Sequence, residues 1–152
     1  MTFRNTILTL VALAATPFAN ATIDIDEAYA RATPPNATTS AVFATINNDG
    51  DKDRVIVKAV SDASAVVELH DVIMDGDIMQ MRQVESITIP ANGSTILKPG
   101  SLHIMLLDVK EPMLEGSKID VELTFANGEI QALTVPVKKV MAGMKKMDHS
   151  HH

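Results

Sequence analysis

Two histidines and two methionines in the middle of the chain have types and a spacing that suit metal binding. They are His70, Met81, His103 and Met105, separated by ten, twenty-one and one residues. Imidazole and thioether groups without any cysteine form a soft ligand set, which favours Cu(I). A thioether carries no proton to lose and forms no disulfide, so methionine remains a usable ligand in an oxidising compartment. The spacing therefore predicts a Cu(I) site in an exported protein.

The first 21 residues have the pattern of a secretory signal peptide. Arg4 is their only charge, an apolar run follows from Ile7 to Ala15, and Ala19-Asn20-Ala21 offers a small-x-small cleavage site. The apolar run is shorter than the ~20 residues that span a bilayer. We therefore expect residues 1–21 to be removed and residues 22–152 to reach a bacterial periplasm, with no transmembrane segment in the mature chain.

The composition limits the classes of partner and of site. The chain has 13 Lys and Arg against 19 Asp and Glu, a net charge of −6 at pH 7, whereas nucleic-acid binding needs basic stripes. It contains no cysteine, which excludes disulfides, thiolate zinc sites, iron–sulfur clusters and blue-copper centres. A metal site closed by protein ligands also leaves no position for a substrate. We expect neither a nucleic-acid partner nor an enzyme.

Short alternating stretches cut by turn residues predict one all-β domain over residues 22–137, with no sustained helical periodicity. The turns include Asn47-Asn48-Asp49-Gly50, and Asn127-Gly128 is a strong signal for a tight hairpin. Many short strands of this kind are typical of a β-sandwich or barrel. The expected strands are residues 23–31, 40–46, 54–60, 65–73, 77–84, 86–89, 95–98, 102–109, 118–125 and 129–137.

The alternation of side chains along a strand relates some of the candidates to one another. Residues i and i+2 lie ~6.7 Å apart on the same face of a strand. His103 and Met105 should therefore point the same way, and Ile104 between them should face the opposite side. His70 ends the apolar segment Val66–Leu69, close to a turn. We expect a site assembled from strand ends and loops on a rigid sheet.

Each candidate also has a structural interpretation. Only three aromatic residues follow residue 21, so the core must use Val, Ile, Leu and Met. Taken alone, Met81 is then interpreted as a core residue, and His70 as a surface histidine. Two of the five histidines fall in this methionine-dense interval, one of them in His-x-Met, and this concentration favours the metal site. Met79, which shares a strand face with Met81, is the reserve ligand.

The same residues carry a resemblance to a known family. Their order, His-x10-Met-x21-His-x-Met, resembles position for position the signature of the periplasmic copper chaperones called PCu(A)C, also written PCuAC. The resemblance covers roughly residues 23–137, and one departure is Asp71-Val72, where many relatives carry another histidine or methionine. The flanking segments that also look similar are residues 30–35, 67–70, 76–82, 97–100, 103–106 and 123–125.

The resemblance implies a cupredoxin-like Greek-key β-sandwich that binds Cu(I) and passes it to the copper centres of a haem–copper (cytochrome c) oxidase. Thiolates are stronger donors to Cu(I) than thioethers, so the expected acceptor is a reduced cysteine-containing protein. Two alternatives remain open. The same site could sequester copper for tolerance, or the chain could be an exported β-sandwich module, for adhesion or scaffolding, that binds no metal. We expect a monomer.

Residues 138–152 form the last expected segment, a flexible tail rich in methionine and histidine. The tail has no apolar period that would pack on the core, and its bias is typical of metal-binding tracts. Imidazoles suit Cu(II) and thioethers suit Cu(I), so the tail is a candidate second copper site. A fragment of a purification tag or a solvated tail without a role are the alternatives. The candidate ligands are Met141, Met144, Met147, His149, His151 and His152.

Overall fold

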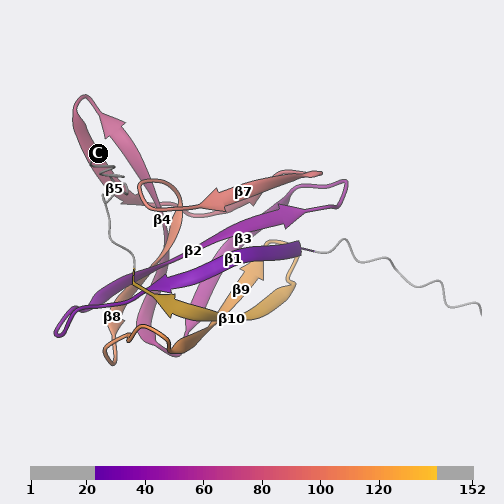
Figure 1. Ribbon diagram of the computed structural model, residues 1–152. Coiled ribbons are helices and arrows are strands. Elements are labelled where there is room, and N and C mark those ends of the chain that lie inside the picture. The colour runs from indigo at the N-terminus through magenta and orange to yellow at the C-terminus, as the bar shows by residue number, and fades with distance from the viewer. Residues whose placement is uncertain (1–22, 140–152) are drawn as a thin grey trace, which may run out of the picture.

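The computed structural model describes residues 23–139, and all regular elements in this range are β-strands (Figure 1). The predicted all-β class is confirmed, and each predicted strand overlaps an observed one. The strands are β1 (Ile23–Arg31), β2 (Thr39–Asn48), β3 (Arg54–Ser61), β4 (Ser64–Asp75), β5 (Ile78–Gln83), β6 (Ile87–Ile89), β7 (Gly93–Leu97), β8 (His103–Val109), β9 (Lys118–Phe125) and β10 (Ile130–Lys138).

Neither end of the chain belongs to the described part. The expected signal peptide, residues 1–21, lies outside the described residues, and so do residues 140–152 of the expected tail. Lys138, the first residue of that tail, belongs instead to β10. Residues 23–139 contain no helix that is long and apolar enough to cross a membrane.

The strands are hydrogen-bonded in the order β5-β4-β8-β2-β1-β10-β9-β3-β6, and β7 pairs with β2 beside β8. The described pairs are antiparallel except that between β1 and β10, which is parallel. Strands that follow one another in sequence are thus often separated in space, as in Greek-key arrangements. The two halves of this path pack around one hydrophobic core, as in a β-sandwich.

The core consists mainly of Val, Ile and Leu side chains from the inner faces of the strands. Among the methionines of residues 23–139, only Met113 is buried in this core, at 3% exposed. Core packing therefore does not explain why the chain is rich in methionine. The largest fully buried side chains are Phe125, Ile46, Ile56, Ile87, Ile89, Leu106, Leu123, Val42, Val121, Val135 and Val137.

The strand β2 has two partners in succession along one edge. Its residues 39–42 pair with β8 and its residues 44–48 pair with β7. The loop of residues 98–102 joins these two strands and leaves the sheet at the junction, held by a 3.0 Å hydrogen bond from the Lys98 N–H to the Leu102 carbonyl. Side chains on the outer face of β2 are buried near this junction, including Phe43 at 2% exposed.

Two local predictions are wrong. Asn47 and Asn48 were expected in a turn but belong to β2, where the buried Asn48 side chain accepts a 3.0 Å hydrogen bond from the Gly50 N–H and so shapes the turn that follows. His70 was expected to end the apolar segment of its strand, close to a turn. It lies in the middle of β4, which continues to Asp75 because its second half pairs with β5 in a hairpin.

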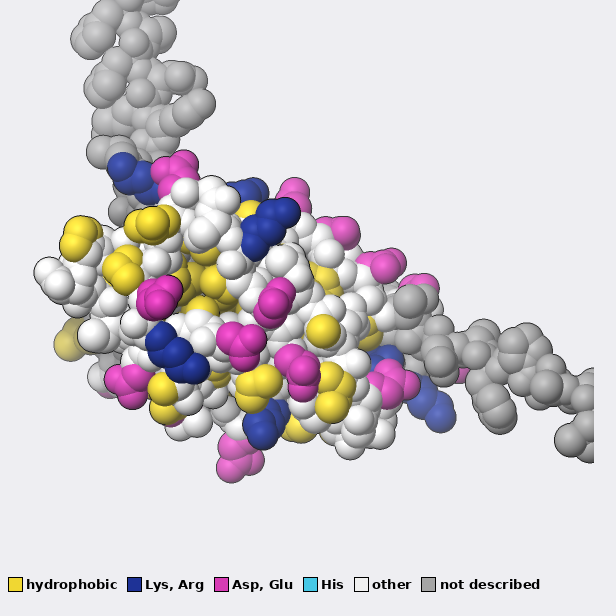
Figure 2. All heavy atoms as spheres, turned by 90° about the horizontal axis from the view of Figure 1, so that it is seen from below, with side chains coloured by type: hydrophobic (Ala, Val, Ile, Leu, Met, Phe, Trp, Pro, Cys, Tyr) yellow, Lys and Arg dark blue, Asp and Glu magenta, His cyan; other side chains and the backbone are white. Residues whose placement is uncertain are grey.

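The surface carries charges of both signs. Seen from below (Figure 2), acidic and basic side chains are interspersed with hydrophobic ones, and one region of this face is hollowed and lined by hydrophobic side chains. No continuous basic stripe is visible on the described part of this face.

Candidate metal centre

The register of three neighbouring strands brings the four predicted ligands to one face of the sheet. His70 in β4 lies directly opposite His103 at the start of β8, and Met105 follows two residues later. Met81 in β5 lies opposite Val72 in β4. Residues directly opposite one another in neighbouring strands, and residues two apart in one strand, share a face of the sheet. The four candidate ligands and Val72 therefore all lie on the same side of the sheet. The four candidate side chains project from strand faces, with His103 at the start of β8 and His70, Met81 and Met105 within their strands.

The reverse side of the same strands is core. Leu69, the neighbour of His70, pairs with Ile104, the neighbour of His103. These two side chains are 4% and 2% exposed, so the prediction that Ile104 faces away from the candidate ligands is confirmed. Packing on the inner face thereby determines which residues reach the outer face.

The four side chains span a gradient from buried to exposed. His103 is 3% exposed, Met105 is half-buried, and Met81 is 53% exposed. The alternative in which Met81 is a core residue is therefore wrong. The His70 side chain is only 13% exposed, so it is not a surface histidine either.

The two imidazole rings lie close to each other. Their centroids are 5.7 Å apart and their planes are inclined by 48°. Because a metal-bound imidazole nitrogen lies about 2 Å from the ion, rings at this separation can meet at a single ion.

The hydrogen bond of His103 determines which ring nitrogen is free. Its Nδ1 lies 2.8 Å from the Ser101 carbonyl oxygen. A carbonyl oxygen can only accept, so Nδ1 carries the hydrogen and the lone pair of the neutral ring is on Nε2. Such a bond to the backbone is typical of metal-binding histidines, because it orients the ring.

His70 has the opposite arrangement. Its Nε2 lies 2.7 Å from Oε2 of Glu68, two residues earlier on the same face of β4. A neutral ring that donates Nε2–H to this carboxylate has its lone pair on Nδ1. This Nδ1 is buried and has no hydrogen-bond partner, which is costly for a polar atom unless a ligand satisfies it. The orphaned nitrogen fits a metal-binding role.

A small pocket of about 120 Å³ opens beside His103 on this face. Aromatic and cationic groups form its wall, since the Phe43 ring lies 6.2 Å from the His103 ring and 5.5 Å from Cζ of Arg31. The pocket thus shelters the buried imidazole while Met81 forms part of its rim. The lining residues are Arg31, Thr39, Ser40, Ala41, Phe43, Val72, Met81, Pro99, Gly100, His103 and Met105.

The remaining predicted ligands are not part of this cluster. Met79 is 59% exposed and lies opposite Met74, further out on the β4–β5 hairpin. The tail candidates Met141, Met144, Met147, His149, His151 and His152 lie outside the described residues. Residues 23–139 contain no group of three or more His, Cys, Asp or Glu side chains that could hold a metal.

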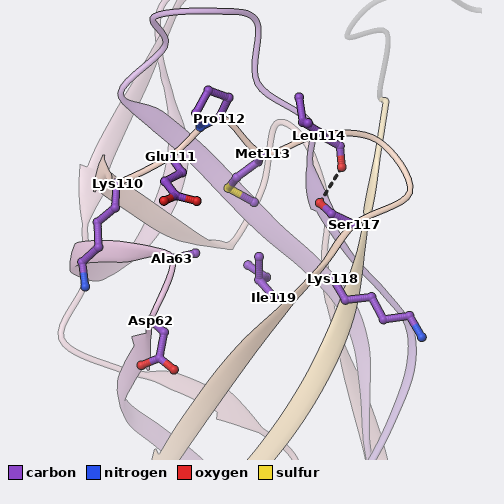
Figure 3. Close-up of a pocket in the computed structure, with 10 residues that line it drawn as sticks. All are labelled: Asp62, Ala63, Lys110, Glu111, Pro112, Met113, Leu114, Ser117, Lys118 and Ile119. Carbon is purple, nitrogen blue, oxygen red and sulfur yellow. Dashed lines mark hydrogen bonds between the residues drawn. The ribbon is translucent and has the colours of Figure 1, made fainter.

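A larger pocket, of about 540 Å³, lies near the other end of β8 (Figure 3). None of the four predicted ligands lines it. Met113 is the only methionine among the lining residues, and its backbone is tied to Thr33 by hydrogen bonds of 2.8 and 2.9 Å. The Ser117 hydroxyl donates a 2.6 Å bond to the Leu114 carbonyl there. Met113 thus anchors this loop to the core.

Three residues around the site had no role in the sequence-based prediction. Glu68 could have been found, because its spacing of two from His70 puts both on one strand face. The bond from His103 to the Ser101 carbonyl could not have been found, because it depends on the geometry of the loop of residues 98–102. Phe43 reaches the site through the pairing of β2 with β8, which no local pattern indicates.

The comparisons with known proteins agree with this geometry. Residues 23–137 match the model of the LpqE-like family, described as "Putative lipoprotein LpqE-like". The chain belongs to the LpqE-like, PCuAC-related family. It is 34% identical over 117 residues to "Putative lipoprotein Lxx21020" of Leifsonia xyli subsp. xyli, covering 76% of this chain and 69% of that protein. It is 30% identical over 99 residues to "Uncharacterized protein RP573" of Rickettsia prowazekii, covering 64% and 55%.

Solved structures of PCuAC domains have the same fold as this LpqE-like domain. The copper-bound PCuAC domain from PmoF2 has a TM-score of 0.67 at 18% identity, covering 78% of this chain and 93% of that one. The solution structure of CuI-DR1885 from Deinococcus radiodurans has a TM-score of 0.64 at 27% identity, covering 86% and 89%. The predicted family and the cupredoxin-like fold are thus confirmed.

The surroundings of His103 keep its ring neutral. Burial is the largest influence and lowers the pKa of His103 below its ordinary value of 6.5, and the charges of His70 and Arg31 act in the same direction. The hydrogen bond to Ser101 and the Asp71 carboxylate oppose this shift without reversing it. A neutral ring retains the lone pair on Nε2, so His103 is prepared to bind a cation.

This yields a prediction for the metal-free LpqE-like domain. In a series of NMR spectra recorded against pH, the ring resonances of His103 should show a midpoint below 6.5, because burial disfavours the imidazolium ion. Protons would then compete for this nitrogen only in more acidic solution than at an ordinary histidine. A midpoint at or above 6.5 would contradict the account of a buried ring.

Proposed function

We propose that this protein is a periplasmic Cu(I) chaperone that holds one Cu(I) with His70, Met81, His103 and Met105. The observation that carries the proposal is the convergence of the four side chains on one sheet face, with a free nitrogen on each of two adjacent rings. The likeness to structures named as a copper-bound PCuAC domain and as CuI-DR1885 supports it. In this proposal copper is the cargo of the protein.

The donor set explains how such a site could hold copper and still release it. Nε2 of His103, Nδ1 of His70 and two thioether sulfurs are neutral donors, and they suit a soft monovalent ion. Without a thiolate, the site binds Cu(I) less tightly than a cysteine site does. His103 and the wall around Phe43 shield the inner side of the ion, while the exposed Met81 leaves a route toward a partner.

The ranking of donors supports a cysteine-containing acceptor, and the family resemblance suggests the pathway to which it belongs. An acceptor with reduced cysteines would draw Cu(I) from a site of imidazoles and thioethers. We propose that this acceptor belongs to the assembly pathway of a haem–copper oxidase, as the PCu(A)C resemblance implies. Export to the periplasm is consistent with the signal-like residues 1–21 and with a relative named as a lipoprotein. Sequestration for tolerance is the second candidate function, since it needs the same site.

The tail would supply an additional copper site. We propose that Met141, Met144, Met147, His149, His151 and His152 bind copper independently of the folded domain, with Cu(II) on the imidazoles. The support for this is the concentration of three methionines and three histidines in residues 141–152.

One prediction of this proposal concerns the thioethers. Replacing Met81 and Met105 together by Leu roughly conserves volume and should cost less than about 1.5 kcal/mol of unfolding free energy. Anaerobic titration with Cu(I) against a competing chelator should nevertheless show a loss of affinity exceeding the ~100-fold that removal of a supporting partner typically causes.

The buried Met113 offers a matched control, because it lies in the core and not at the site. The Met113→Leu variant should change stability by a similar amount and leave the Cu(I) affinity unchanged. An unchanged affinity in Met81→Leu/Met105→Leu would show that the ligands are misassigned.

Another prediction of the proposal separates delivery from sequestration. Mixing the Cu(I)-loaded protein with a reduced dithiol protein at neutral pH should move copper almost completely to the dithiol, because thiolates are the stronger donors. The distribution can be measured after separating the two proteins by chromatography under nitrogen. Copper that stays on this protein at equilibrium would rule out a donor role and favour sequestration.

A further inference from the structure

Three exposed methionines are concentrated on one hairpin. Met74, Met79 and Met81 are 65%, 59% and 53% exposed, and all belong to the β4–β5 hairpin. The hairpin projects from the body of the sandwich (Figure 1), and every residue of β5 is exposed. β5 is also the terminal strand of the sheet. Packing in the core therefore gives no reason for thioethers at these positions.

The register of the hairpin pairs two of these thioethers directly. Met74 lies opposite Met79, and the loop Gly76–Asp77 joins the closing pair Asp75 and Ile78. The closing pair of a two-residue hairpin is hydrogen-bonded, and such pairs alternate along the ladder with the non-hydrogen-bonded kind. Met74 and Met79 are thus a non-hydrogen-bonded pair, whose Cβ atoms lie about 4.5–5.5 Å apart. Two sulfur atoms at this spacing can meet at one soft ion.

This pair lies next to the proposed inner site on the same face. Met79 and Met81 are two residues apart in β5, about 6.7 Å along the strand. The methyl carbon of Met79 lies 3.7 Å from the position that a Cβ atom on Gly100 would occupy, and Gly100 lines the pocket beside His103. The thioethers of Met81, Met79 and Met74 therefore follow one another along one face, from the inner site to the tip of the hairpin.

We propose that Met74 and Met79 form a second, outer Cu(I) site, which holds the ion briefly as it passes between the inner site and the surroundings. The passage role rests on the proposed function, whereas the binding of a soft cation by this pair does not. Two thioethers bind more weakly than two thioethers and two imidazoles, so the outer site fills second and exchanges fast. The ion remains Cu(I) throughout, and no electron or proton is transferred.

The charges at the hairpin tip favour a cation there. Asp75 precedes the turn and Asp77 lies in it, and both are exposed. Acidic side chains at an exposed tip raise the local concentration of cations, to a degree that falls with ionic strength. They would attract the ion without being its soft ligands.

The test is an NMR titration of the full-length protein in which the methionine methyl groups are labelled with ¹³C. Cu(I) is added anaerobically, and each methyl resonance is assigned by single Met→Leu variants. The inner residues Met81 and Met105 should shift during the first equivalent. Met74 and Met79 should shift together only as more copper is added, and the Met113 methyl in the core should not move.

The Met74→Leu variant is the decisive comparison, with Ile78→Leu on the other face of the hairpin as its control. In Met74→Leu the shift of Met79 should be lost while Met81 and Met105 respond as before. In Ile78→Leu, the Met79 shift should persist. The outer site is overturned if Met79 never shifts, if it shifts with the first equivalent, or if its shift survives in Met74→Leu.

A measurement of release tests the passage role. Loss of copper from the singly loaded protein to the chelator bicinchoninate should be several-fold slower in Met74→Leu/Met79→Leu than in Ile78→Leu, at unchanged equilibrium affinity. Equal release rates would overturn passage through the pair. Failure of Met81 and Met105 to shift in the titration would instead refute the proposed function, and the Met74–Met79 pair would still be judged by its own resonances.

Discussion

The antiparallel register between β4 and β8 determines what lies on the outer face of the sheet. On the inner face, Leu69 opposes Ile104 within the hydrophobic core. A slip of one residue would turn these side chains outward and bury polar ones, which the core does not allow. The same register holds His70 opposite His103. The free energy of core packing therefore also holds the two imidazole rings next to each other.

The environment of the site combines a closed side with an open one. Burial of His103 against Phe43 favours its neutral ring, and the hydrogen bond to the Ser101 carbonyl fixes the orientation of that ring. Met81 lies on an exposed strand at the edge of the sheet. A rigid inner half suits selection of a soft ion, and an accessible outer half suits its release by ligand exchange. Under the proposed function, neutral donors without a thiolate would make this exchange with a cysteine site favourable in one direction.

Much of this architecture could be predicted from the sequence, because strands and turns leave local signals. Alternation and turn residues located the ten strands, with β1 and β9 matching the expected ranges. The orientation of Ile104 followed from a period of two. The adjacency of β4 and β8, which are distant in sequence, follows from the packing of the whole chain and has no local signal. For that reason the position of His70 opposite His103 had no local signal, and neither did the shelter provided by Phe43, which depends on the pairing of β2 with β8.

A crystal structure of the Cu(I)-loaded protein, with anomalous scattering recorded at the copper edge, tests the central claim most directly. The account predicts one strong anomalous peak on the outer face between β4, β5 and β8, in bonding contact with Nδ1 of His70, Nε2 of His103 and the sulfur atoms of Met81 and Met105. A loaded crystal with copper elsewhere, and none at this position, would contradict it.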